Sequence, residues 1–180
     1  MLRQFARVTE PPPPRTIDRL LFGSGRSIAG TVYGTIVAMS VIAATGSAAG
    51  DADPWRLAGF VASSAVVFWL AHVYSNALDA SIRSGRRIDW RSLTSVARHE
   101  AAIPLAAVAP IVALCLGAAG VLRESRSIWL ALGLGIATLG VQAWRYAKIE
   151  SLGRSKTLVV VGLNVLLGLA LVVLKAGLSH

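Results

Sequence analysis

Residues 57–78 read LAGFVASSAVVFWLAHVYSNAL, a run of 22 residues without a single Asp, Glu, Lys or Arg. A helix of roughly 17–25 apolar residues crosses the hydrocarbon core of a bilayer, so this run has the length and composition of one membrane span. Four further stretches of at least 18 residues also lack these charged residues: 27–50, 101–122, 127–144 and 157–174. The sequence therefore predicts an all-α integral membrane protein, a bundle of five transmembrane helices.

The composition agrees with this class and leaves little room for a second domain. Hydrophobic residues make up 54% of the 180 residues and charged residues 15%, whereas soluble domains carry about 25% charged residues. The mean hydropathy is +0.62. We therefore divide the chain into a cytoplasmic tail, residues 1–26, and a five-helix transmembrane domain, residues 27–180.

The basic residues predict the orientation of the chain. Of its 18 Lys and Arg residues, 14 fall on one side of the membrane, in the tail and in the loops 79–100 and 145–156, and 4 fall on the other. Cytoplasmic loops are enriched in Lys and Arg, so we expect an N-in/C-out protein in the bacterial cytoplasmic (inner) membrane. Anionic lipid headgroups are expected partners on the cytoplasmic side. Nucleic acid is not, because no aromatic stacking platforms are interleaved with the basic residues.

Two short interfacial helices are expected on the cytoplasmic side. The prolines at 11–14 favour an extended segment, after which Thr16 can cap a first amphipathic helix. In the loop 79–100, Gly85 interrupts the chain, and Asp89 or Ser92 can cap a second helix that can continue into the third span.

Polar side chains within the spans are the candidates for function, because polar groups in hydrocarbon are costly. Counted at 1.5 Å per residue from the nearest inner charge, Tyr33 and His72 lie about 10 Å inside the membrane and Asn164 about 12 Å. The outer half offers only small hydroxyls, so we expect a polar cavity that opens toward the cytoplasm. The cavity candidates are Tyr33, His72, Asn76, Asp79, Gln142 and Asn164, with an inner rim of His99, Glu100 and Tyr146.

Three interpretations of His72 are open. A neutral imidazole can donate a hydrogen bond to a helix carbonyl or to Asn164 and hold two helices together. A histidine can instead handle protons, since its side chain titrates near neutral pH. Metal or haem ligation is the third, but there is no second deep histidine, and His99 and Glu100 are expected nearer the surface. We therefore predict no metal site and no cofactor. The rim carboxylates can equally be solvated and paired with arginine.

Two backbone patterns stand out within the spans. Pro104 and Pro110 each remove a hydrogen-bond donor from the third span, which predicts a kink and a candidate hinge. Gly30-x-x-x-Gly34 and Gly133-x-x-x-Ala137 have the spacing that lets two helices approach closely.

Two short motifs carry a resemblance to known proteins. The run from Phe68 to Tyr74, FWLAHVY, is followed by Arg98-His99-Glu100, and together they resemble segments of small uncharacterised bacterial multi-pass membrane proteins. The resemblance implies a bacterial inner-membrane location and carries over no activity, substrate or cofactor.

The sequence leaves three classes of function open. The first is a small proton-linked transporter or channel, built as a homo-oligomer around His72. The second is a non-catalytic subunit or scaffold of a larger membrane complex. The third is a lipid-active enzyme, for which no catalytic residue is predicted because the sequence contains no hydrolase, zinc-protease or nucleotide-binding motif.

Overall fold

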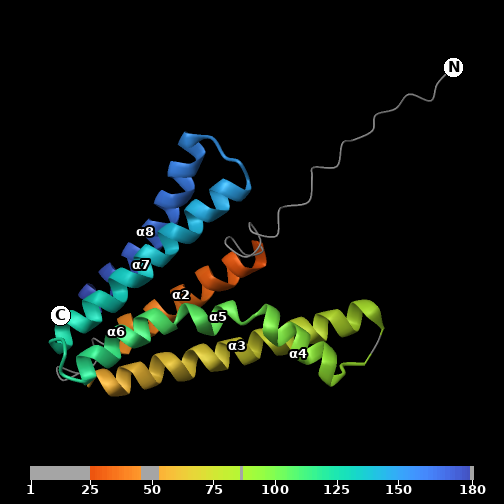
Figure 1. Ribbon diagram of the computed structural model, residues 1–180, viewed down its shortest axis with the longest axis horizontal. Coiled ribbons are helices and arrows are strands. Elements are labelled where there is room, and N and C mark those ends of the chain that lie inside the picture. Colours follow the sequence, from red (N-terminus) through yellow and green to blue (C-terminus); the bar gives the residue numbers. More distant parts are fainter. Residues whose placement is uncertain (1–24, 46–52, 86, 179–180) are drawn as a thin grey trace.

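The structure is a computed structural model that describes residues 25–45, 53–85 and 87–178 (Figure 1). Helices cover most of these residues, and no β-strand occurs among them, so the prediction of an all-α chain is confirmed for the described part. The proline run and the helix expected at Thr16 lie outside the described residues. The helices are α2 (Gly25–Thr45), α3 (Pro54–Ser84), α4 (Trp90–His99), α5 (Ala102–Ala106), α6 (Val108–Ala118), α7 (Glu124–Ile149) and α8 (Arg154–Leu178).

Four of these helices, α2, α3, α7 and α8, are each long and apolar enough to cross a membrane. The segments Trp90–Ala106 and Val108–Ala118 meet the same criteria only as a pair, and they are bent by 41° relative to each other. The described residues therefore hold four continuous candidate spans, and a fifth if the bent pair is one span. The difference from five regular spans lies in the predicted third span, 101–122.

The break in this span coincides with its two prolines. A proline ring pushes against the carbonyl four residues earlier in a helix and offers it no N–H. For Pro104 that carbonyl belongs to Glu100, which accepts a hydrogen bond from the Ile103 N–H instead, at 3.0 Å. For Pro110 it belongs to Ala106, where α5 ends. The sequence predicts a bend at these prolines, and the chain bends between α5 and α6.

Helix α3 is longer than the predicted span. Asp53 caps its start by accepting a hydrogen bond from the Trp55 N–H at 3.0 Å, and Gly85 ends it in the left-handed conformation at φ 64°. Its 31 residues extend over about 46 Å, whereas the hydrocarbon core is about 30 Å thick. Residues 79–84 thus continue the helix beyond the end predicted at residue 78.

Helix α4 turns back along the end of α3 (Figure 1). Asp89, one of the two caps that the sequence allows, begins it by accepting a hydrogen bond from the Ser92 N–H at 2.9 Å. The Trp69 indole N–H of α3 donates to the Ala97 carbonyl of α4 at 3.1 Å. This bond joins the two helices and satisfies the polar atom of a tryptophan placed well inside α3.

Helix α2 packs against α3, α5, α7 and α8. Its contact with α5 requires glycine, because a Cβ atom on Gly34 would overlap the Ile103 carbonyl. On the α7 side, a Cβ on Gly135 would lie 2.5 Å from the Met39 sulfur. The predicted close approach at Gly30-x-x-x-Gly34 therefore occurs within the chain. A Cβ on Gly133, by contrast, would meet no atom within 4 Å.

The hydrophobic core occupies one end of the bundle. Its residues come from the C-terminal half of α2, the N-terminal half of α3, Ala107 and α6, and the part of α7 between Ile128 and Leu139. At this closed end, Gly117 of α6 packs against Ser127 and Pro54. At the opposite, open end, the start of α2, the α3–α4 turn and the α7–α8 connection lie apart from one another (Figure 1).

Candidate functional site

Tyr33 of α2 and His72 of α3 lie together, as their common predicted depth suggests. Their ring centroids are 4.7 Å apart with the planes at 45°, and Phe68 meets the Tyr33 ring edge-on at 6.2 Å. Tyr33 and His72 are both half-buried. Neither makes a hydrogen bond to another described residue. The imidazole nitrogens of α3 and the phenol oxygen of α2 therefore keep their hydrogen-bonding capacity, and both helices are candidate spans.

This geometry differs from a structural role in which His72 is hydrogen-bonded to a helix carbonyl or to Asn164. The Asn164 side-chain amide donates to the Val160 carbonyl of its own helix, at 3.0 Å. It is half-buried on α8, which packs against α7 and α2. The described contacts of His72 are thus aromatic, and no hydrogen bond links it to the third residue of the predicted layer.

Gln142 is a buried polar residue of α7, 7% exposed. Its side-chain oxygen accepts a hydrogen bond from the Arg145 guanidinium at 2.9 Å, one turn further along the helix. Arg145 is itself half-buried. The sequence assigns Gln142 to the cavity, but its spacing from Arg145 already allows this pairing, since residues three apart are neighbours on a helix.

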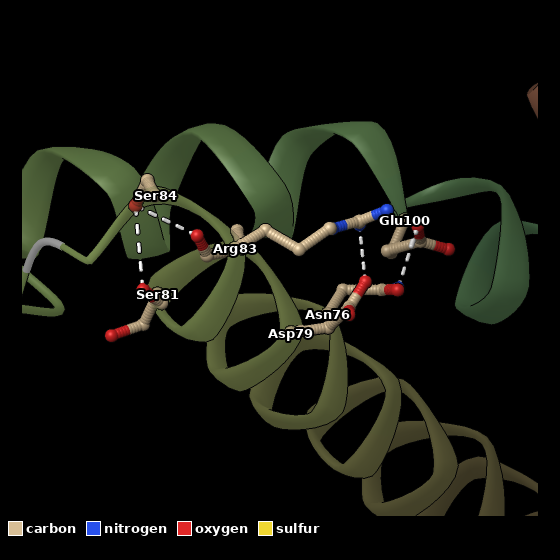
Figure 2. A network of polar contacts seen from close by, with 7 residues as sticks. Asn76, Asp79, Ser81, Arg83, Ser84 and Glu100 are labelled. Atoms are coloured by element: carbon tan, nitrogen blue, oxygen red, sulfur yellow. Dashed lines mark hydrogen bonds and ion pairs between the residues drawn. The ribbon is translucent and has the colours of Figure 1, made fainter.

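Polar groups in the C-terminal part of α3 and just after α4 form a small network (Figure 2). The Asn76 side-chain amide donates to a Glu100 carboxylate oxygen at 3.1 Å, and Asp79 forms an ion pair with Arg83. Asn76 lies one turn of α3 from His72, so the two side chains fall on the same helix face. This network lies between the Tyr33–His72 contact and the α3–α4 turn.

The remaining rim candidates are separate from this network. His99 contacts the Ser95 carbonyl of its own helix through Nδ1, at 2.8 Å. Tyr146 is exposed on α7. No group of three His, Cys, Asp or Glu residues in the described ranges could hold a metal ion.

Four small hydroxyls of the candidate spans are satisfied locally. Thr31, Thr35, Ser40 and Thr138 each donate to the carbonyl four residues earlier in their own helix, at 2.8 Å. Ser and Thr commonly bond in this way inside helices. These four hydroxyls therefore do not need a ligand, in contrast to the polar atoms of Tyr33 and His72.

Two pockets lie at the open end, and neither is lined by His72. One, of about 590 Å³, lies between α7 and α8, and includes Trp144 and Arg154 in its walls. The other, of about 490 Å³, lies at the α3–α4 turn and includes Ser81 and Arg87. The sequence does not predict the α7–α8 pocket. The basic residues of the loop 145–156 hint at an anion-binding region. Which of them line the same pocket depends on the conformation of the α7–α8 connection, which the sequence does not show.

Comparison of the chain with models of known protein families, with curated proteins and with solved structures finds no match.

Proposed function

We propose that this chain is an N-in/C-out protein of the bacterial cytoplasmic membrane that acts as a small proton-linked transporter or channel, with Tyr33 and His72 as its proton-handling site. In this proposal the bent pair α4–α6 completes five spans, and α4 lies at the cytoplasmic surface of the membrane.

The distribution of charge supports this orientation. The open end carries the basic residues of the α3–α4 turn and of the α7–α8 connection, including Arg83, Arg87, Arg154 and Lys156. Described basic residues near the closed end are fewer: Arg56, Arg123, Arg126 and, by its place in α8, Lys175. Because Lys and Arg are enriched on the cytoplasmic side, the open end would face the cytoplasm and the apolar core would close the outer side.

The observation that carries the proposal is the unused hydrogen-bonding capacity of Tyr33 and His72. A polar group left without a partner in hydrocarbon costs several kcal/mol, so such groups persist where water, a proton or a solute can reach them. A histidine changes charge between about pH 5 and 8. Ionisable residues within membrane spans generally mark ion or proton pathways.

A polar route from the open end supports the same function. Asn76 and Glu100 lie one turn of α3 closer to the cytoplasm than His72, and they already join α3 to the segment that precedes α5. Discontinuous membrane helices commonly form the substrate and ion sites of transporters. The break at Pro104 and Pro110 could therefore serve as the hinge that opens this route, and a homo-oligomer would shield the exposed side of α3 from lipid.

A non-catalytic subunit of a larger complex is the second candidate, and one observation favours it. In the apolar stretch of α8 that could cross a membrane, only 6% of the residues are buried. Leu163 and Leu166 are 60% and 62% exposed. A partner helix could cover this face as well as lipid could. No observation favours a lipid-active enzyme.

Proton flux in reconstituted vesicles tests the proposal. The protein is placed in liposomes that contain a pH-sensitive dye, and a potassium diffusion potential drives protons inward between pH 5 and 8. We expect wild-type protein to acidify the lumen faster than protein-free vesicles do. His72→Gln should abolish the added rate, because glutamine keeps hydrogen bonding but does not titrate.

His99→Gln is the matched control, since it removes a histidine that lies on α4 and contacts its own helix. It should leave the flux unchanged. A wild-type rate equal to that of empty vesicles, or a His72→Gln rate equal to wild type, would contradict proton handling at this site.

A further inference from the structure

The pocket between α7 and α8 is independent of the Tyr33–His72 contact and has a different chemistry. It encloses about 590 Å³ where α7 ends and α8 begins. Its walls include Trp144 and Lys148 of α7, Leu152 of the connection, and Arg154, Thr157 and Leu158 of α8. Two cations and several apolar groups thus face one space.

The turn between the helices creates this space. Ser151 adopts a left-handed conformation at φ 50°, and the Leu152 N–H donates back to the Ala147 carbonyl at 2.9 Å. This closure is typical of a helix C-terminus. It ends α7 abruptly, so that Lys148 and Arg154 reach the pocket from opposite sides of the connection.

The positive charge of the pocket favours an anionic ligand. Lys148 and Arg154 line it, and no Asp or Glu does. Glu150 is exposed in the same connection but is not part of the wall. The Lys148 ammonium lies 5.6 Å from the centre of the Trp144 ring, which holds the cation at the edge of the pocket.

The apolar part of the pocket favours a ligand that also has an apolar portion over a free anion. Leu158 is 73% exposed, and Val159 and Leu163 further along α8 are exposed as well. These apolar side chains belong to the candidate span Arg154–Val173, of which little is buried. Trp144 lies at the other side, in a position typical of tryptophan at the level of lipid headgroups. A phosphate bound at the cations would therefore lead directly to a surface that accepts acyl chains.

We infer that this pocket binds one anionic phospholipid, with its headgroup phosphate between Lys148 and Arg154 and an acyl chain along the exposed apolar surface of α8 that begins at Leu158. The inference rests on the membrane location in the proposed function but not on the role of His72. It describes a defined site, which differs from the general attraction of basic loops to an anionic membrane surface.

Native mass spectrometry of the full chain in mild detergent tests the site. The protein is titrated with dioleoyl phosphatidylglycerol, with the zwitterionic dioleoyl phosphatidylcholine, or with glycerol 3-phosphate, which carries the phosphate without acyl chains. We expect a single saturable adduct with phosphatidylglycerol, and at least tenfold less adduct with each of the other two. Equal binding of phosphatidylcholine, or of glycerol 3-phosphate, would overturn the assignment.

The double variant Lys148→Met/Arg154→Met should form at least tenfold less phosphatidylglycerol adduct, because both cations are removed. Methionine keeps part of the apolar stem of each side chain. Both side chains are exposed, so the variant should fold, and its melting temperature in detergent checks this. If the double variant does not fold, each single variant should still form at least threefold less adduct than wild type.

Arg91→Met/Arg98→Met is the matched control, because it removes the same charge from exposed residues of α4 that line neither pocket. It should keep the adduct. An equal loss in this control would show diffuse electrostatic attraction and overturn the site. The measurement is independent of proton flux, so its failure would leave the role of His72 intact, and failure of the flux would leave the lipid site intact.

Discussion

The closed and open ends of the bundle are built from the same helices but differ in their contacts. At the closed end, large apolar side chains are at most 1% exposed: Met39, Ile42, Leu114 and Leu132. At the open end, α3 presents Asn76 and Asp79 to neighbours that are themselves polar. The same candidate spans thus combine close apolar packing at one end with polar contacts between helices at the other.

The same contrast separates two kinds of polar group. Near the closed end, Ser127 is fully buried and donates to the Glu124 carbonyl at 2.7 Å. Toward the open end, Tyr33 and His72 contact each other through their rings and make no hydrogen bond to a described residue. In these examples the buried hydroxyl is satisfied by its own helix, whereas the half-buried rings keep unused hydrogen-bonding capacity.

The largest expected effect is an all-or-none difference in accessibility between the two ends. Ser125 and Ser155 are both exposed, near the start of α7 and the start of α8. In a Cys115→Ala background, Ser125→Cys should react with a membrane-impermeant thiol reagent added to intact cells, and Ser155→Cys should react only after the cells are opened. The readout is a mass shift on a gel.

The reverse pattern, with Ser155→Cys labelled from outside, would invert the orientation of the closed and open ends. Serine is the matched starting residue at both positions. It is preferable to Asp53, whose side chain caps α3, because changing that residue would also weaken the helix.

A smaller effect tests how tightly the closed end is packed. Gly135→Leu should destabilise the protein by about 1–3 kcal/mol, because the added side chain must displace the fully buried Met39. Gly133 lies two residues away on the same helix, and the Cβ atom of a leucine there would meet no atom within 4 Å. Gly133→Leu should leave stability unchanged or raise it by less than about 1 kcal/mol through better helix propensity.

Unfolding of both variants in mild detergent, followed by circular dichroism, measures this difference. Similar stabilities for the two leucine variants would mean that Met39 can move aside at little cost, and that the closed end is not tightly packed around it.

The smallest effect concerns the Asn76–Glu100 hydrogen bond at the open end. The bond is exposed and joins a neutral group to a carboxylate, so we expect a coupling energy of about 0.5–1 kcal/mol. A double-mutant cycle with Asn76→Ala and Glu100→Ala measures it by chemical unfolding. Additive effects of the two substitutions would indicate that this contact does not join α3 to α4 energetically.

Much of the fold could be predicted from local sequence. Charge-free runs identify the candidate spans, because desolvating a charge in hydrocarbon is costly at any position of a helix. Asp89 and Gly85 predict where helices begin and end, since capping is a property of a few neighbouring residues. The prolines predict the bend of the third span for the same reason.

The candidate site could be predicted only in part. The common depth of Tyr33 and His72 follows from counting residues along two helices, and the structure brings these rings together. Asn164 has the same predicted depth, yet its amide bonds to its own helix. Depth does not determine rotation about the helix axis, so counting cannot distinguish a residue that faces the site from one that does not.

By itself, the sequence determined that this chain is helical, apolar enough to cross a membrane several times, and interrupted at Pro104 and Pro110. Only the tertiary structure decided that α5 packs on Gly34, that Trp69 bonds to Ala97, and that Lys148 and Arg154 share a pocket. Helix formation and membrane insertion depend on residues close together in the chain. Contacts between helices depend on how their surfaces interdigitate, which no single segment specifies.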